Sequence, residues 1–189
     1  MRTEKQKILI LGANGQVGKE LSRRAGNFEV NTTAFTRTEL DITDSQAVAR
    51  ILEKLRPNTV INAAAYTAVD DAENYPEVAY KVNRDAPENL AKICEKLSIP
   101  IIHISTDYVF DGEKSGAYLE DDPVRPLGIY GRSKEAGEAV IRDNTEKYII
   151  LRTSWVYAAH GINFLRTMMR LANERRELNR VEDQFGVPT

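Results

Sequence analysis

The chain has 189 residues, of which 42% are hydrophobic and 29% are charged, and its formal net charge is -2. This balance is typical of a globular protein and gives no reason to expect a nucleic-acid or anionic membrane partner. No apolar run approaches the roughly 20 residues that a membrane-spanning helix needs. The charged N-terminal stretch also lacks a secretory signal, so we expect a cytoplasmic protein.

Strand and helix patterns alternate along the chain. Continuous apolar or β-branched runs predict strands at residues 7–11, 28–35, 59–63, 101–105 and 148–153. Apolar residues at helical spacing predict helices at 16–25, 45–55, 77–83, 130–143 and 161–178, and a further helix that starts after Asp85 and includes residues 90–97. Asp44 and Asp85 are expected to cap two of these helices, and residues 111–128 to form a long loop. Strands that are apolar throughout and each followed by a helix predict a doubly wound, Rossmann-type parallel sheet with helices on both faces.

Cysteine and histidine content argues against a metal site. Cys94 is the only cysteine, lies in a helical run and is expected to be a buried structural thiol. His103 and His160 lie far apart with no cysteine or histidine near them, so we predict no metal site. His103 falls in an apolar strand pattern and is expected to be a core histidine with satisfied hydrogen bonds.

The first strand leads into a glycine-rich turn, Gly12-Ala13-Asn14-Gly15-Gln16-Val17-Gly18. In this spacing Gly12 allows a tight turn, Gly15 lets the backbone approach a pyrophosphate, and Gly18 lets the helix pack closely on the sheet. Gln16 and Val17 open the helix and present unpaired N–H groups to an anion. The turn therefore predicts a nicotinamide dinucleotide, NADPH or NADH.

Two other strand ends are candidates for the rest of the cofactor site. Arg37 follows the second strand, where an acidic residue would usually bind the ribose 2′-hydroxyl. It either pairs with a 2′-phosphate, which favours NADPH, or is an ordinary surface arginine. Asp41 and Ile42 are placed beside the adenine. Small side chains end the third strand and would let a ribose and nicotinamide lie against the backbone, so we predict contacts from Ala63, Ala64, Ala65 and Tyr66.

Tyr130 and Lys134 are four residues apart, so one helix face presents both. A nearby ammonium would bring the tyrosine pKa down from about 10 toward the working pH. Lys134 could also bind the nicotinamide ribose. Thr106 follows the fourth strand, at the edge where such folds bind ligands, and its hydroxyl could hold the reacting oxygen. Together these residues predict hydride transfer between a nicotinamide and a carbonyl or alcohol carbon.

With these motifs the chain resembles the extended short-chain dehydrogenase/reductases, over essentially its whole length. The most specific segments are Asn62 to Asp70 (NAAAYTAVD), Ser105 to Phe110 (STDYVF), Arg152 to Tyr157 (RTSWVY) and Asp183 to Thr189 (DQFGVPT). The branch it resembles most reduces the C4 ketone of a dTDP-linked 6-deoxy sugar with a hydride from NAD(P)H. The resemblance implies that Tyr130 protonates the new alkoxide, Lys134 tunes Tyr130, and Thr106 orients the ketone.

The resemblance also implies that Asp107 and Trp155 contact the sugar nucleotide, with an ordinary core aromatic as the alternative for Trp155. Related dehydratases carry Asp-Glu where this chain has Asp107-Tyr108, and that difference favours simple carbonyl reduction. Two alternatives stay open: a reductase or epimerase of another nucleotide sugar, and a non-catalytic NADP-binding regulatory subunit like that of methionine adenosyltransferase. The presence of Thr106, Tyr130 and Lys134 favours an enzyme.

Members of this family are longer than 189 residues, and their additional residues complete a substrate-binding lobe. We therefore expect residues 1–157 to form the NAD(P)-binding domain and residues 158–189 to begin the substrate lobe. The cofactor site is then expected to be complete and the sugar-nucleotide site incomplete. Family members are often homodimers, some with interface magnesium, for which this sequence shows no convincing ligand cluster.

Overall fold

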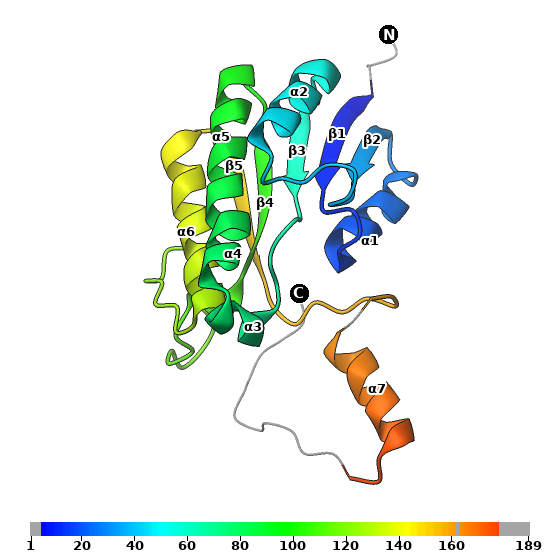
Figure 1. Cartoon of the computed structure of the whole chain (residues 1–189), viewed down its shortest axis with the longest axis vertical. Coiled ribbons are helices and arrows are strands. Elements are labelled where there is room, and N and C mark those ends of the chain that lie inside the picture. The colour runs from blue at the N-terminus through cyan, green and yellow to red at the C-terminus, as the bar shows by residue number, and fades with distance from the viewer. Residues whose placement is uncertain (1–4, 162, 178–189) are drawn as a thin grey trace.

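A single parallel sheet of five strands, in the order β2-β1-β3-β4-β5, forms the centre of the molecule (Figure 1). The computed structural model describes residues 5–161 and 163–177. The strands are β1 (Gln6–Leu11), β2 (Val30–Phe35), β3 (Thr59–Asn62), β4 (Ile101–Thr106) and β5 (Tyr148–Thr153). The strand order reverses between β1 and β3, which is where doubly wound sheets bind ligands. The predicted Rossmann-type fold is confirmed.

Helices follow the strands as the sequence predicts, with additional short segments. They are α1 (Gln16–Ala25), α2 (Ser45–Leu55), α3 (Val69–Asn74), α4 (Pro76–Tyr80), the π-turn η1 (Lys81–Asp85), α5 (Ala86–Leu97), the short 3₁₀ segment η2 (Asp107–Val109), α6 (Ile129–Asn144) and α7 (Phe164–Glu174). Parallel crossovers are right-handed, so α1 lies on one face of the sheet, whereas α2, α5 and α6 lie on the other (Figure 1). The α1 face remains open at edge strand β5, where Ile149 and Leu151 are 55% and 46% exposed.

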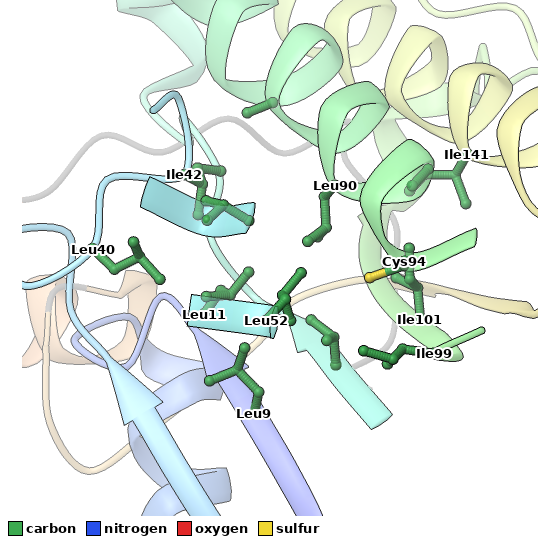
Figure 2. Close-up of a cluster of buried hydrophobic side chains, with 14 residues drawn as sticks. Leu9, Leu11, Leu40, Ile42, Leu52, Leu90, Cys94, Ile99, Ile101 and Ile141 are labelled. Atoms are coloured by element: carbon green, nitrogen blue, oxygen red, sulfur yellow. The ribbon is translucent and has the colours of Figure 1, made fainter. Parts of the chain in front are cut away.

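The main core fills the space between the sheet and helices α2 and α5 (Figure 2). Leu9 and Leu11 of β1 face Leu52 of α2 and Leu90 of α5 there. Cys94 lies in the same cluster, and burial raises its thiol pKa to about 12. The predicted buried structural thiol is therefore confirmed, since a thiol with this pKa stays protonated and unreactive at neutral pH.

Several element boundaries differ from the sequence predictions for identifiable reasons. β2 begins at Val30 because the Phe28 N–H bonds the Ala25 carbonyl in a turn, which leaves the Phe28 side chain exposed. The Asp44 cap is confirmed, since its carboxylate accepts the Ala47 N–H at 2.9 Å. The Asp85 cap was wrong, because the chain is already helical there and the π-turn runs directly into α5.

Helix α7 ends at Glu174, four residues before the predicted end, and residues 178–189 lie outside the described residues. The proposed boundary at residue 157 therefore stays a prediction. Within residues 5–161 and 163–177, no helix has the length and apolar character to cross a membrane. Nor do three histidine, cysteine, aspartate or glutamate side chains gather anywhere in that part of the chain as metal ligands.

Candidate active site

At two positions of the glycine-rich turn, Gly12 and Gly18, the neighbouring backbone leaves no room for a side chain. Gly12 has a φ of +85°, and a Cβ there would lie 2.6 Å from the Ala64 nitrogen. A Cβ on Gly18 would lie 2.3 Å from the Gly12 carbonyl oxygen. Helix α1 begins at Gln16, and its N-cap residue Gly15 supplies no side-chain cap, so the N–H groups of the first turn are available to an anion. The turn thus has the shape and the donors that a pyrophosphate needs.

A pocket of about 200 Å³ opens beside this turn, along the carboxyl ends of β1, β2 and β3. Its walls include most of the predicted cofactor contacts, namely Gly12, Gly15, Arg37, Asp41, Ile42, Ala63, Ala64, Ala65 and Tyr66. Asn14, Leu40 and Val82 also line it and were not among the predicted contacts. Gln16, Val17, Gly18, Tyr130 and Lys134 are not part of its walls. The pocket therefore corresponds to one part of the predicted site and does not include the predicted catalytic residues.

Arg37 lies at the rim of this pocket with its side chain 78% exposed, and its Nε is 3.5 Å from an Asp41 carboxylate oxygen. The other Asp41 oxygen accepts the Thr43 N–H and hydroxyl, each at 2.9 Å. The Thr43 N–H is the main cause of the lowered Asp41 pKa, and Arg37 contributes. A guanidinium carries five N–H donors, so pairing with Asp41 leaves donors for a phosphate.

Thr106 and Tyr130 are brought together at the carboxyl edge of the sheet, as predicted. Both are buried, and Thr106 Oγ1 accepts the Tyr108 N–H at 3.2 Å. Burial raises the Tyr130 pKa, the negative charge of Asp107 adds to this, and a hydrogen bond with the Thr106 side chain opposes it. The Tyr108 ring meets the Tyr130 ring edge-on, 5.5 Å between centroids. The result is a phenol that stays protonated well above neutral pH.

Lys134 lies one turn after Tyr130 on α6 and is buried. Its hydrogen-bond partners were not predicted from the sequence. Its Nζ donates to the Ile104 carbonyl oxygen at 2.7 Å and lies 3.3 Å from His103 Nε2. Burial lowers the Lys134 pKa to about 8. We expected Lys134 to lower the Tyr130 pKa, but burial of Tyr130 outweighs any such effect in this structure. The tuning role of Lys134 stays a prediction.

Asp107 and Trp155, the two predicted sugar contacts, lie at the ends of adjacent strands β4 and β5. Asp107 Oδ2 accepts the Ser154 hydroxyl at 2.7 Å. Trp155 is only partly buried and has a φ of +48°, which is rare for a bulky residue and costs about 1–3 kcal/mol. Its ring packs edge-to-face on Phe164 of α7 at 5.4 Å. Trp155 therefore lies outside the main core, at the junction between the sheet and α7.

Asn83 is a buried residue of the π-turn η1 that the sequence reasoning missed. Its side chain accepts the Tyr66 N–H at 2.8 Å and donates to the Tyr66 carbonyl and the Ser133 hydroxyl, at 3.0 and 2.9 Å. Ser133 in turn donates to the Tyr130 carbonyl oxygen at 2.8 Å. A Cβ on Gly137 would lie 2.0 Å from the Asn83 carbonyl oxygen. Asn83 thus links the pocket wall to the helix that carries Tyr130 and Lys134.

Gln16, predicted as a cofactor contact, has a further structural partner. Its Oε1 accepts a hydrogen bond from Asn163 Nδ2 at 3.0 Å. Asn163 also caps α7 by accepting the Arg166 N–H at 3.0 Å. The segment after β5 therefore returns to the start of α1, beside the glycine-rich turn.

Comparison with known proteins places these features in a family context. A sequence profile described as "RmlD substrate binding domain" matches residues 6–189. A dTDP-4-dehydrorhamnose reductase of Burkholderia thailandensis is 48% identical over 183 residues, which make up 97% of this chain and 61% of the relative. These findings confirm the resemblance seen in the motifs.

Solved structures agree with the sequence comparison. A dTDP-4-dehydrorhamnose reductase from Clostridium acetobutylicum matches with a TM-score of 0.93 at 43% identity, over 97% of this chain and 65% of that chain. Another from Bacillus anthracis, in complex with NADP, matches with a TM-score of 0.89 at 40% identity, over 92% of this chain and 62% of that chain. The chain thus spans less than two thirds of the length of these relatives.

Proposed function

The chain belongs to the family of the RmlD substrate binding domain, and from that premise we propose that it is an NAD(P)H-dependent oxidoreductase. The proposed reaction is reduction of the C4 ketone of dTDP-4-dehydro-L-rhamnose to dTDP-L-rhamnose, a step in nucleotide-sugar and polysaccharide biosynthesis. The dTDP-4-dehydrorhamnose reductases that match at 40% identity or more support this reaction, and the Bacillus anthracis relative forms a complex with NADP.

The residues present fit a nicotinamide dinucleotide. The glycine-rich turn leaves no room for a Cβ at Gly12 or Gly18, and the open N–H groups of α1 suit a pyrophosphate. Arg37 and Asp41 would hold the adenosine end, and Ala63 to Tyr66 would lie along the ribose and nicotinamide. When bound, the reduced nicotinamide supplies the hydride for the reaction.

The catalytic roles follow from the surroundings of Thr106 and Tyr130. As the C4 ketone is reduced, its oxygen gains negative charge and needs a proton. Tyr130 supplies that proton, since its phenol is protonated at neutral pH. Thr106 holds the same oxygen by a hydrogen bond, and Lys134 binds ribose hydroxyls. Asp107 and Trp155 contact the sugar from the ends of β4 and β5.

The observation that carries this proposal is the buried Thr106–Tyr130 pair, which lies at the same carboxyl edge of the sheet as the glycine-rich turn. Product analysis tests it. Incubation with NADPH and enzymatically generated dTDP-4-dehydro-L-rhamnose should yield dTDP-L-rhamnose. A C4 epimer, or conversion only of another keto sugar, would favour the second candidate, a reductase or epimerase of a different nucleotide sugar. Cofactor binding without turnover of any keto sugar would favour the non-catalytic regulatory subunit.

Cofactor preference has its own test at Arg37. If Arg37 pairs with a 2′-phosphate, Arg37→Ala should weaken NADPH binding about tenfold or more, because a hydrogen bond to a charged group contributes about 1.5–3 kcal/mol. NADH binding should stay unchanged. Arg50→Ala, an exposed arginine on α2, serves as the matched control. An equal loss of affinity for NADPH and NADH would show that Arg37 does not bind the 2′-phosphate.

The cytoplasmic location and the homodimer remain predictions from the sequence. The division into a cofactor domain and the beginning of a substrate lobe is also a prediction from the sequence. Separate calorimetric titrations of cofactor and sugar nucleotide test that division, and tight binding of the sugar nucleotide would contradict an incomplete substrate site.

A further inference from the structure

A buried chain of three polar side chains runs from the nucleotide pocket to the catalytic lysine. Asn62 of β3, His103 of β4 and Lys134 of α6 are each at most 1% exposed. Asn62 Nδ2 lies 3.1 Å from His103 Nδ1, and His103 Nε2 lies 3.3 Å from Lys134 Nζ. Because these groups have no access to water, their donors and acceptors must match one another.

The Ala64 N–H fixes the orientation of the chain. It donates to Asn62 Oδ1 at 3.2 Å, so the amide oxygen faces Ala64 and the amide nitrogen faces His103. Since Asn62 Nδ2 is a donor, His103 Nδ1 must accept and the ring proton must reside on Nε2. That proton points toward Lys134 Nζ, which already donates to the Ile104 carbonyl oxygen. A nitrogen that accepts a hydrogen bond needs a lone pair, so this arrangement belongs to a neutral Lys134 amine.

A protonated Lys134 requires a different arrangement of the same side chains. An ammonium has three donors and no acceptor, so His103 Nε2 must then accept and Nδ1 must carry the proton. The Asn62 amide must turn its oxygen toward that proton, and the Ala64 N–H then loses its acceptor. The two arrangements differ by one proton, which Lys134 carries only in the second. The His103 ring is neutral in both and differs only in which nitrogen holds its proton.

We propose that His103 is a positioning residue that couples the protonation of Lys134 to the Asn62 amide and, through the Ala64 N–H, to the wall of the nucleotide pocket. Ala64 lines that pocket, so the chain joins the two parts of the site that the pocket alone does not connect. The coupling is a property of these buried groups and does not depend on the reaction. One consequence is that a ligand in the pocket would change the charge on Lys134, which lies one helical turn from Tyr130. The importance of this consequence for catalysis rests on the proposed function.

The surroundings of the two titrating groups support this exchange. Burial lowers the Lys134 pKa to about 8, and the charge of Glu138 on the same helix opposes the shift. Burial, followed by the charge of Lys134, holds the His103 pKa well below its ordinary value, so the ring stays neutral. Tyr130 on α6 is itself kept protonated. The exchange between the two arrangements is therefore expected near pH 8.

Nitrogen-15 NMR of the histidine rings tests the proposal directly, because proton positions on Nδ1 and Nε2 give distinct spectra. The chain has only two histidines, and a His160→Gln variant assigns their signals. In the full 189-residue chain, His103 should change from the Nδ1–H form at about pH 6.5 to the Nε2–H form at about pH 9.5, without passing through a charged ring. The midpoint should lie near pH 8.

The pH-dependent change should disappear in Lys134→Met and persist in Lys92→Met, a surface lysine on α5 that pairs with Glu88. A His103 ring that keeps one form from about pH 6 to 10, or that becomes charged in this range, would overturn the proposal. So would a change that survives Lys134→Met. The experiment needs no substrate or cofactor, so its outcome is independent of whether the chain proves to be a reductase.

Discussion

Glu138 of α6 is a fully buried carboxylate, so the free energy of unfolding should depend strongly on the groups that bind it. Its Oε1 accepts the Ser105 hydroxyl at 2.5 Å and Arg152 Nε at 3.0 Å. Its Oε2 accepts Arg152 at 2.7 Å and Arg142 at 3.1 Å. Arg152 also donates to the Glu120 carbonyl oxygen at 3.2 Å, so it holds the 111–128 loop against the end of the sheet.

Replacing Arg152 with methionine would remove the guanidinium that binds both oxygens of the buried Glu138 carboxylate. Removing one member of a buried ion pair costs about 3–5 kcal/mol, and we expect a loss of about 3 kcal/mol because Ser105 and Arg142 remain. Arg142→Met is the matched control on the same carboxylate. Its side chain is 37% exposed and makes a single contact, so the loss should stay under about 1 kcal/mol. Urea unfolding at about pH 8 measures both changes.

The pH dependence of the loss provides a second check. Burial alone would raise the Glu138 pKa, but hydrogen bonds from Arg152 and Ser105 outweigh it and hold the pKa below its ordinary value. In the parent chain this stabilisation is present above the unfolded pKa and is lost as the pH falls through the folded pKa. Without Arg152, burial should raise the pKa, so protonation removes the buried charge and the loss should shrink at about pH 5. A loss no larger than that of Arg142→Met, or equal at both pH values, would refute this reasoning.

Three other predictions follow from single contacts. Gly18→Ala should destabilise the chain by about 1–3 kcal/mol in urea unfolding, because its Cβ would overlap a main-chain carbonyl of the glycine-rich turn. Gly26→Ala, with open space around it, should cost nothing measurable, and equal effects would contradict the packing argument. Asn83→Leu should cost about 1–3 kcal/mol by leaving the partly buried Tyr66 N–H unpaired, and should weaken NADPH binding measured by fluorescence. Cys94 should resist a thiol reagent at about pH 8 until the chain is unfolded; rapid labelling of the native protein would contradict its raised pKa.

The strand and helix order was predictable because each element carries its own periodic pattern. The bounds of α1 and β5 agree with the structure residue for residue. The roles of Gly12 and Gly18 in shaping the turn were also predictable, because the spacing itself implies contacts too close for a Cβ. Local sequence therefore determines the part of the site that lies along one turn and the strand before it.

Other features depend on contacts between distant residues and leave no local pattern. The π-turn at Lys81–Asp85 adds a residue within a helix, which shifts Asn83 toward Tyr66 and removes the need for a cap at Asp85. The spacing of Tyr130 and Lys134 placed them on one helix but could not show how deeply each is buried. Burial reverses the expected shift of the Tyr130 pKa, and the fold places His103 beside the lysine.

We propose that this chain reduces a keto nucleotide sugar through Tyr130, and one measurement tests this activity most directly. The loss of NADPH absorbance should be followed with enzymatically generated dTDP-4-dehydro-L-rhamnose for the parent chain and for Tyr130→Phe. We predict turnover by the parent chain, and a loss of at least about 100-fold in Tyr130→Phe with NADPH binding retained, since a general acid contributes about 10²–10⁴-fold. Equal turnover by the two proteins, or no turnover by a parent chain that binds both NADPH and the sugar nucleotide, would contradict the claim.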